Sequence, residues 1–467
     1  MRTTLDAGSG DFSIRFLTTA DRVALLLGCA LLFVWSIPWV ITLRLALIVG
    51  LVALLIWQGF AQRGHLGRAF LTHRHFWNIY LVLTAWIVVE ALVFGVQSRA
   101  VLGEIWGQWI RSGITGLAGF LLATVVSRKE PQKAGPLLAM AMAVTLAFQV
   151  GLHDVDTLWR WWDEGKLPFQ ETRIVQNRAG ISFVTNLLMA MVCAEAMARI
   201  LFRCRYLPVS STTLVLLIAI CVFATYVVGT RYGTIGFLAL IASCALVALV
   251  AKRKSINLPL LFGIGAIVLA ALGAFGWATV KSDVRWLKLK DTIPVALDTE
   301  HQLAWRNDAV PMPTLPDGAL ADASAYLRLA WAKEAVMAIG REPLGVGYGR
   351  DSFGRAMHMI YPDYASSLNC HSGILNFTIG VGWPGLLLWL ALIGLLAVNG
   401  WRSFFRFQNP AGLLLLFVVS GFFTRSLVDG NFQDHMFEQF MFLAMMFNAL
   451  ANQDRRAGAA PSDPGGD

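Results

Sequence analysis

The sequence predicts an all-α polytopic membrane protein with about twelve transmembrane helices and one large, partly helical loop on the outer side of the membrane. Three observations lead to this fold class. Of the 467 residues, 57% are hydrophobic and only 14% are charged, and the mean hydropathy of +0.60 lies outside the range of soluble domains. Many apolar runs approach the ~20 residues that a helix needs to cross a bilayer. Basic residues gather in alternate connections between those runs.

The apolar runs give twelve candidate spans. Pro38 and a short turn divide the first two, so the sequence leaves open whether residues 23–57 form one helix or two. The candidate spans are residues 23–38, 40–57, 76–95, 105–126, 134–151, 179–198, 209–228, 234–250, 258–280, 383–398, 411–427 and 435–451.

The distribution of the basic residues predicts the orientation of the spans. The loops after the second, fourth, sixth, eighth and tenth spans carry fourteen Lys and Arg in total. The short loops after the third, fifth, seventh and eleventh spans carry five. The positive-inside rule places the first set in the cytoplasm, together with both termini. Orientation therefore explains the net charge of +9, and we expect membrane lipids as partners and no nucleic acid.

One outward connection is far longer than the others, and loops of this length are usually functional. It divides the chain into four predicted parts. These are an N-terminal bundle of about nine helices (1–280), the periplasmic loop (281–382), about three C-terminal helices (383–451) and a disordered cytoplasmic tail (452–467).

The long loop is itself expected to be partly helical. Residues 324–340 predict a helix with Ser324 as its N-cap. One face of this helix would carry four apolar residues. These are Leu327, Trp331, Ala335 and Ala338. A glycine-rich turn is expected to follow at 341–350.

Four arginines are predicted at the outer membrane face, which is more than the positive-inside rule expects there. Arginine offers a permanently charged, planar fork that suits phosphate. Together the four suggest a polyanion such as a pyrophosphate, and Gly229 and Gly233 would let backbone approach that ligand closely. The arginines are Arg178 at the start of the sixth span, Arg231 in the turn before the eighth, Arg328 on the loop helix and Arg425 at the end of the eleventh.

His371 lies where the long loop enters the tenth span. Asn369 and Ser372 suggest that a helix begins here, and the sequence Gly-Val-Gly would end it before Pro384 opens the span. We therefore expect His371 on a short interfacial helix. The positive end of that helix would lower the pKa of the imidazole, and a general base must be neutral.

No metal or cofactor site is predicted. Asp154 and Asp156 match the DxD pattern of metal-dependent sugar transferases, but they face outward, where nucleotide sugars are absent. The sequence contains no Walker A motif, no GxGxxG before a helix and no CxxC.

Three segments resemble the O-antigen ligase/polymerase superfamily. They are GTRYGTIGFLALIA from residue 229, RLAWAKEAVMAIGREPLGVGYGRDSF from residue 328 and HSGILNFTIGVGWPGLLLWLALIG from residue 371. The family pattern has an SRG-like turn, an R…W…PLLGVG segment in a long periplasmic loop and an H…L…GxxG segment entering the next span. Here the turn reads GTRYG and the histidine segment begins HSGIL, so acceptor preference stays open.

The resemblance, which is strongest to the ligases of Gram-negative bacteria, implies a GT-C-like fold and a glycosyltransferase. Such enzymes transfer O-antigen from undecaprenyl pyrophosphate to a sugar hydroxyl of the lipid A–core oligosaccharide. They act at the periplasmic face of the inner membrane without ATP or metal. The family's essential arginines correspond to Arg231 and Arg328, its essential histidine corresponds to His371, and Arg178 corresponds to a further arginine.

The mechanism expected from this resemblance is a single displacement. Arg231, Arg328 and Arg178 would hold the pyrophosphate, with Arg425 also in the substrate-binding set. His371 would deprotonate the acceptor hydroxyl. No carboxylate is evident as a nucleophile, so inversion is expected rather than the retaining scheme with two carboxylates.

Three alternatives are left open by the sequence. An O-antigen polymerase and a protein O-oligosaccharyltransferase belong to the same superfamily and differ in the acceptor. A transporter of lipid-linked oligosaccharides belongs to another class. It would require charges near the membrane midplane and internal symmetry, whereas the basic cluster here lies on one face.

Overall fold

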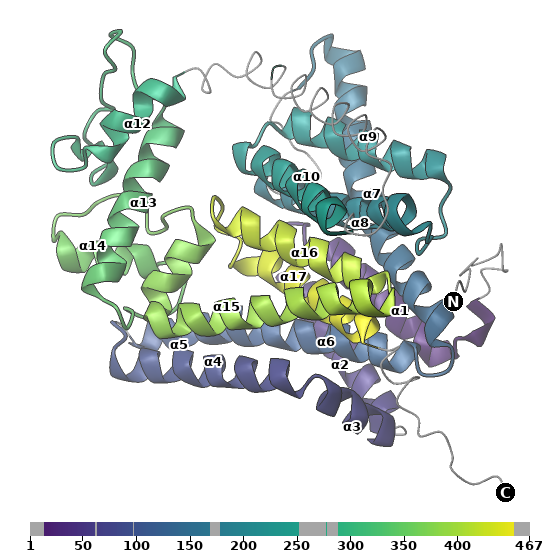
Figure 1. The fold of residues 1–467 in the computed structure, drawn as a ribbon. Helices are drawn as coiled ribbons and strands as arrows, with labels where there is room; N and C mark the ends of the chain where they lie inside the picture. Colours follow the sequence, from purple (N-terminus) through teal and green to yellow (C-terminus); the bar gives the residue numbers. More distant parts are fainter. Residues whose placement is uncertain are drawn as a thin grey trace, which may run out of the picture.

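The computed structural model describes residues 14–60, 63–96, 98–168, 178–251, 277 and 288–452. Throughout these ranges the regular elements are helices (Figure 1), and two isolated β-bridges pair Asn307 with Ala365 and Thr314 with Leu320. The helices of the first half are α1 (Thr19–Val34), α2 (Ile41–Phe60), α3 (Arg63–Thr72), α4 (Arg74–Val93), α5 (Ser98–Glu104), a π-helical turn (Ile105–Ile110), α6 (Arg111–Val126), α7 (Pro131–Glu164), α8 (Arg178–Phe202), α9 (Ser211–Val228) and α10 (Arg231–Ala251). Those of the second half are α12 (Leu289–Leu297), α13 (Ala323–Arg341), α14 (Ser352–Ile360), α15 (Gly373–Phe407), α16 (Ala411–Ser426) and α17 (Asp434–Ala451).

The described residues contain eight helices that are long and apolar enough to cross a membrane. The chain is thus an all-helical, multi-pass membrane protein, as the sequence predicts. The eight are α2, α4, α5 continued through α6, α7, α8, α9, α10 and α15.

The remaining predicted spans are either shorter helices or lie outside the described residues. The helices α1, α16 and α17 coincide with three of them. The predicted span at 258–280 lies outside the described residues apart from residue 277, and the predicted disordered tail after residue 452 lies outside them entirely. The count of about twelve spans and the side of the membrane on which the long loop lies therefore stay predictions. The first apolar stretch forms two helices, because residues 35–40 form a turn around Pro38.

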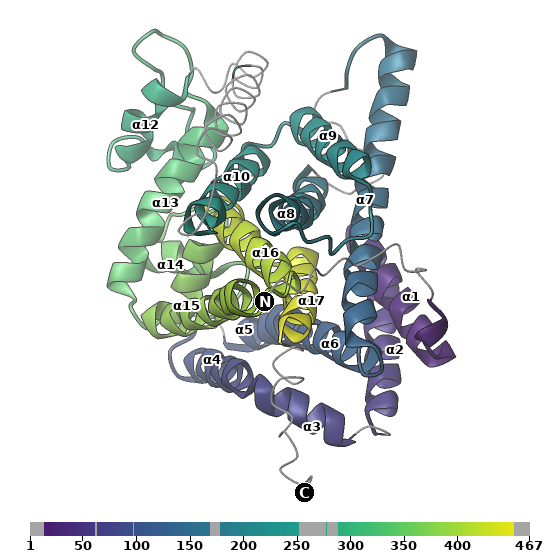
Figure 2. The same cartoon turned by 45° about the vertical axis from the view of Figure 1, so that its right-hand side comes forward.

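Small residues allow the helices of the bundle to approach one another closely. A Cβ atom on Gly119 of α6 would come within 2.1 Å of the carbonyl oxygen of Phe442 on α17. A Cβ atom on Gly400 of α15 would similarly come within 2.7 Å of the carbonyl oxygen of Gly412 on α16. Such contacts are typical of helix packing in membranes, where van der Waals fit stabilises helix pairs. They hold α6 against α17 and α15 against α16. The helices α15, α16 and α17 also pack against one another (Figure 2).

The helix α15 begins at Gly373, ten residues before the predicted span at 383–398. Its axis is interrupted at Gly382, which has φ 67° and ψ −175°, so a short helix precedes the long one. A Cβ atom at Gly382 would lie 2.4 Å from the carbonyl carbon of Leu344, so only glycine fits there. The predicted short helix therefore exists, and it ends at the predicted place. His371 does not lie on it, however, because Ser372 is the N-cap and His371 precedes that cap.

The helix α4 holds both the kink in α15 and the glycine-rich turn that passes over it. The indole Nε1 of Trp86 donates a hydrogen bond to the carbonyl of Val381, at 2.7 Å. One turn further along α4, the carboxylate of Glu90 accepts a hydrogen bond from the backbone N–H of Gly347, also at 2.7 Å. The transmembrane helix α4 thereby fixes the first turns of α15.

The outer segment from residue 288 to 372 has a hydrophobic core of its own, built around Trp305, Tyr326 and Phe353. It lies at the end of the bundle where α15 begins (Figure 1). Its main helix, α13, agrees with the predicted helix at 324–340, and the predicted apolar face packs into this core. The predicted N-cap is wrong, because the carboxylate of Asp322, and not Ser324, accepts the hydrogen bond from the Ala325 N–H.

Candidate functional site

The turn between α9 and α10 places Arg231 at the start of a helix. Gly229 ends α9 in the left-handed conformation, with φ 58°, and two residues later Arg231 opens α10. The second glycine of this turn has a different role from the one expected. A Cβ atom on Gly233 would lie 2.4 Å from the hydroxyl of Ser182, so this glycine allows α10 to approach α8 and not a ligand.

Arg231 joins the membrane bundle to the outer segment. Its Nη2 atom lies 2.8 Å from the carboxylate of Asp322, and both side chains are largely buried. Asp322 also caps α13 through its contact with Ala325. One carboxylate therefore fixes both the orientation of Arg231 and the start of the helix that carries Arg328.

Tyr232 is the point around which the predicted arginines gather. The guanidinium carbon of Arg425 lies 4.7 Å from the centre of the Tyr232 ring, and that of Arg328 lies 5.6 Å from it. Arg178 and the carboxylate of Asp429 are also within electrostatic range of the phenol. The structure thus brings together arginines from α8, α10, α13 and α16, which are far apart in the sequence.

The guanidinium of Arg425 is buried and bonded to other groups of the protein. Its side chain has no exposed surface, and its Nε atom donates to the carboxylate of Asp429 at 2.7 Å. The two Nη atoms donate to the hydroxyl of Ser182 and the carbonyl of Ala179 on α8. This geometry indicates that Arg425 holds α16 against α8 and thereby positions the neighbouring arginines. Direct contact between Arg425 and a substrate is less favoured.

Arg328 and Arg178 differ from Arg425 in their surroundings. Among the described residues, Arg328 has no hydrogen bond and no ion pair, and it is held only by the ring of Tyr232. Arg178 is the exposed first residue of α8. A cluster with four guanidinium groups and two carboxylates, Asp322 and Asp429, keeps an excess of positive charge that can attract an anion.

His371 is exposed and lies within electrostatic range of Arg328 and Asp429 of this cluster. Its backbone has φ 56°, a left-handed conformation that few residues other than glycine adopt, and its N–H donates to the side chain of Asn369 at 2.7 Å. Its ring stacks on Trp331 of α13, with 5.6 Å between centroids and 22° between planes. Within the described part of the chain neither ring nitrogen has a hydrogen-bond partner, and the residue is exposed.

The electrostatic environment of His371 favours its neutral form. The surrounding protein lowers the pKa of the imidazole, and the charge of Arg328 lowers it further, while the carboxylate of Asp429 acts in the opposite direction. The expected direction of the pKa shift is thus found, but its cause is different. His371 precedes the helix, so crowding and a neighbouring cation replace the helix end as the reason.

The connection between α16 and α17 ties His371 to the arginine cluster. The carbonyl of Asp429 accepts a hydrogen bond from the N–H of Gly373 at 2.9 Å, while the carboxylate of the same residue pairs with Arg425. Asp429, Asp322 and Tyr232 were not singled out from the sequence. A signal existed only for Asp429, because it follows Arg425 by four residues, a spacing that brings oppositely charged side chains together at the end of a helix.

Comparison with known families gives one match. Residues 213–390 match a family model described as O-antigen ligase. The matched segment contains Arg231, Arg328 and His371, whereas Arg178 and Arg425 lie outside it. No curated protein matches the chain.

Proposed function

We propose, because residues 213–390 match the O-antigen ligase family model, that the chain transfers O-antigen from undecaprenyl pyrophosphate to a sugar hydroxyl of the lipid A–core oligosaccharide. The site would face the periplasm from the Gram-negative inner membrane, with both termini in the cytoplasm. One observation carries the proposal: four arginines and an exposed imidazole whose pKa is lowered by burial and by Arg328 gather at the end of the bundle where α15 begins.

The arginines form the donor side of the proposed site. Arg328 is open, Arg231 is oriented by Asp322, and Arg178 lies at the exposed edge of α8. These guanidinium groups would bind the diphosphate of the donor and neutralise the charge that develops on it as it leaves. Permanent charges in fixed positions stabilise such a transition state without reorganisation, which is the electrostatic role that a divalent cation has in other transferases.

His371 is the proposed general base. One of its ring nitrogens takes the proton of the acceptor hydroxyl as the oxygen forms a bond to the anomeric carbon of the donor. The bond between that carbon and the diphosphate oxygen breaks, and its electron pair leaves with undecaprenyl diphosphate. The face of Trp331 supports the imidazole during this step, and it stabilises the positive charge that the ring acquires.

The carboxylates of the cluster support inversion at the anomeric carbon. Asp322 is paired with Arg231 and Asp429 with Arg425, and both carboxylates are largely buried. Retention by double displacement, as in most retaining glycosidases, uses a free carboxylate as the nucleophile. Since these two are held by ion pairs, a direct displacement by the acceptor hydroxyl is the simpler reaction.

The test is reconstitution with defined substrates. Purified protein in liposomes, mixed with lipid-linked O-antigen and rough lipopolysaccharide but no ATP, should form smooth lipopolysaccharide ladders. Chain growth from lipid-linked O-antigen alone would instead identify a polymerase. Movement of the donor across the bilayer without transfer would identify a transporter.

The variant His371→Asn tests the base in the same assay. Asparagine tolerates the left-handed conformation, so the backbone is retained while the proton acceptor is lost. We expect no product from His371→Asn and unchanged activity from the matched control His358→Asn, whose histidine lies on α14. Full activity of His371→Asn would refute the assignment of the base.

A further inference from the structure

Tyr232 lies among the arginines of the cluster, and the reaction described above gives its side chain no role. It directly follows Arg231 in the first turn of α10, and it is half-buried. The cations around it come from α8, α13 and α16, and they are Arg178, Arg328 and Arg425. An anion held by these arginines would therefore lie close to the phenol.

The ring of Tyr232 supports two guanidinium groups that differ in their other contacts. That of Arg425, 4.7 Å from the ring centre, is buried and bonded to α8 and to Asp429. That of Arg328, 5.6 Å from the ring centre, has no hydrogen bond and no ion pair among the described residues. A cation over an aromatic face is attracted by the ring. The ring therefore holds Arg328 in place while the N–H groups of that arginine stay available to a ligand.

The hydroxyl of Tyr232 has no hydrogen-bond partner within the part of the chain that the structure describes. It lies within electrostatic range of the three arginines and of one carboxylate, that of Asp429. This carboxylate is already paired with Arg425, at 2.7 Å. A hydroxyl that is surrounded by cations and has no acceptor there suits a negatively charged oxygen, because O–H···O⁻ hydrogen bonds are short and strong.

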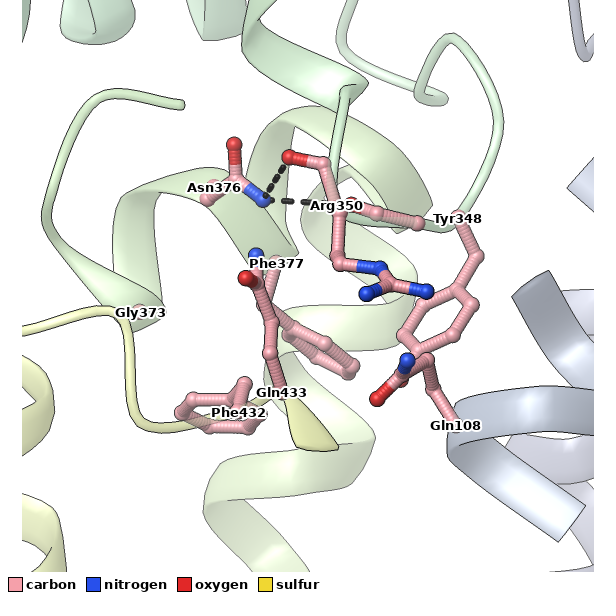
Figure 3. Close-up of a pocket in the computed structure, with 9 residues that line it drawn as sticks. Gln108, Tyr348, Arg350, Gly373, Asn376, Phe377, Phe432 and Gln433 are labelled. Atoms are coloured by element: carbon pink, nitrogen blue, oxygen red, sulfur yellow. Dashed lines mark hydrogen bonds between the residues drawn. The ribbon is translucent and has the colours of Figure 1, made fainter. Parts of the chain in front are cut away.

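A second tyrosine beside an arginine has the opposite surroundings. Figure 3 shows the guanidinium of Arg350 beside the ring of Tyr348. Tyr348 is almost fully buried, and its ring packs edge-on against Trp109 and Phe377. The guanidinium of Arg350 forms a two-point ion pair with Glu104 of α5, with nitrogen–oxygen distances of 3.2 and 3.3 Å. Because this carboxylate neutralises the arginine, the pair does not attract an anion to the phenol, and Tyr348 can serve as a matched control.

The charge of the arginine cluster matches that of a diphosphate. Four guanidinium groups and two carboxylates leave two positive charges in excess. A diphosphate that links a lipid to a sugar carries one negative charge on each phosphate, so the charges balance when such a donor is bound. Further negative charge develops on the diphosphate when the sugar is transferred. An uncharged hydrogen-bond donor such as the phenol stabilises this charge without repelling the arginines.

We propose that the hydroxyl of Tyr232 donates a hydrogen bond to an oxygen of the donor's diphosphate. This inference rests on the proposed function and adds an uncharged contact to the donor side of the site. The phenol keeps its proton throughout, while the bond between the anomeric carbon and the diphosphate oxygen breaks and its electron pair stays on the diphosphate. The hydrogen bond strengthens as that charge grows, so it stabilises the transition state more than the bound donor.

The variant Tyr232→Phe tests the hydroxyl alone, because it keeps the ring that contacts Arg328 and Arg425. In the reconstituted full-length protein, kcat/KM for lipid-linked O-antigen should fall roughly tenfold, the effect of losing one hydrogen bond to a charged group. KM for rough lipopolysaccharide should stay unchanged. Binding of undecaprenyl diphosphate without an acceptor, measured by isothermal titration calorimetry, should weaken as well. The matched control Tyr348→Phe should change none of these values.

Each outcome decides the proposal. The thermal unfolding midpoint of Tyr232→Phe should equal that of the wild type, and a lower midpoint would show that the hydroxyl supports the fold and not the donor. Wild-type values of kcat/KM and of undecaprenyl diphosphate binding would show that the hydroxyl does not contact the diphosphate. An increase in KM for rough lipopolysaccharide alone would assign it to the acceptor. If the wild type binds undecaprenyl diphosphate but transfers nothing, the proposed function is wrong, and the binding measurement alone decides the role of Tyr232.

Discussion

The rings of Trp331 and His371 stack 5.6 Å apart, so the outer segment directly contacts the proposed base. Trp331 is itself fixed, because its Nε1 atom donates a hydrogen bond to the carbonyl of Trp305 at 2.9 Å. The orientation of the imidazole therefore depends on the core of the outer segment as well as on α15. A base whose ring is held in this way loses little entropy when the acceptor arrives.

Replacing Trp331 should lower the rate of transfer without removing the base. Aromatic pairs contribute about 0.5–1.5 kcal/mol beyond the area they bury, which corresponds to a loss of roughly twofold to tenfold in kcat for Trp331→Leu. Trp331→Phe should retain most of the rate, since it keeps a ring beneath the imidazole. Initial rates at saturating substrates measure this difference. Trp383→Leu, at an exposed tryptophan of α15, is the matched control and should behave as wild type. Equal rates for all three variants would show that the stacking has no catalytic role.

The two arginines that contact Tyr232 should respond differently to substitution. Arg425→Ala leaves Asp429 as a buried, unpaired carboxylate, and breaking a buried pair costs roughly 3–5 kcal/mol. Arg328→Ala removes no hydrogen bond or ion pair within the described residues, so stability should change by less than about 0.5 kcal/mol. Thermal unfolding in detergent measures both effects.

The Arg328 and Arg425 variants should also differ in transfer activity. Arg328→Ala should strongly reduce transfer in a folded protein, and Arg328→Lys should recover little, since a single ammonium cannot replace the two-point contact of a guanidinium with phosphate. A stable Arg425→Ala protein that fails to bind donor would instead assign Arg425 to the substrate.

The sequence predicts the transmembrane helices well, because each apolar run is a local property. It also singles out Arg231, Arg328 and His371 as candidate site residues, because the turn, the loop helix and the entry to α15 each have a local motif. The roles of Tyr232 and Asp322 could not be predicted in this way. Tyr232 gathers arginines from helices that are distant in sequence, and Asp322 pairs across ninety-one positions with Arg231.

The entry to α15 shows why local signals fail at its boundaries. The sequence Gly-Val-Gly-Trp-Pro indicates a break, and a break occurs at Gly382. The helix before it is stabilised by Trp86 and by the glycine-rich turn, which are tertiary contacts. The same reason explains the error at the N-cap of α13. Both Asp322 and Ser324 are good caps in isolation, and the ion pair with Arg231 favours Asp322.

The pH dependence of transfer should reflect the lowered pKa of His371. Since the base must be neutral, kcat/KM should rise with pH as the imidazole loses its proton, with a midpoint below the ordinary value of about 6.5. The same shift makes His371 destabilising in acid. The unfolded chain binds its proton more readily, so this contribution appears as the pH falls below about 6.5.

Arg328 provides a variant test of this pH profile. In Arg328→Gln the residual activity should have a midpoint closer to 6.5, because the neighbouring positive charge is gone. Arg341→Gln should leave the midpoint where it is in the wild type. A wild-type midpoint above 6.5 would contradict the proposed environment of the base.

Glu90 should influence catalysis from a distance, since it accepts the N–H of Gly347 and thereby holds the glycine-rich turn over α15. Glu90→Ala leaves that buried N–H without its partner, which costs about 1–3 kcal/mol, and it releases the glycine-rich turn over the start of α15. We expect a lower unfolding midpoint and a lower rate of transfer. Glu90→Gln keeps an oxygen that can accept the same hydrogen bond, so it should recover most of both properties. If Glu90→Gln were as impaired as Glu90→Ala, the negative charge itself would be required, and a role limited to holding the turn would be wrong.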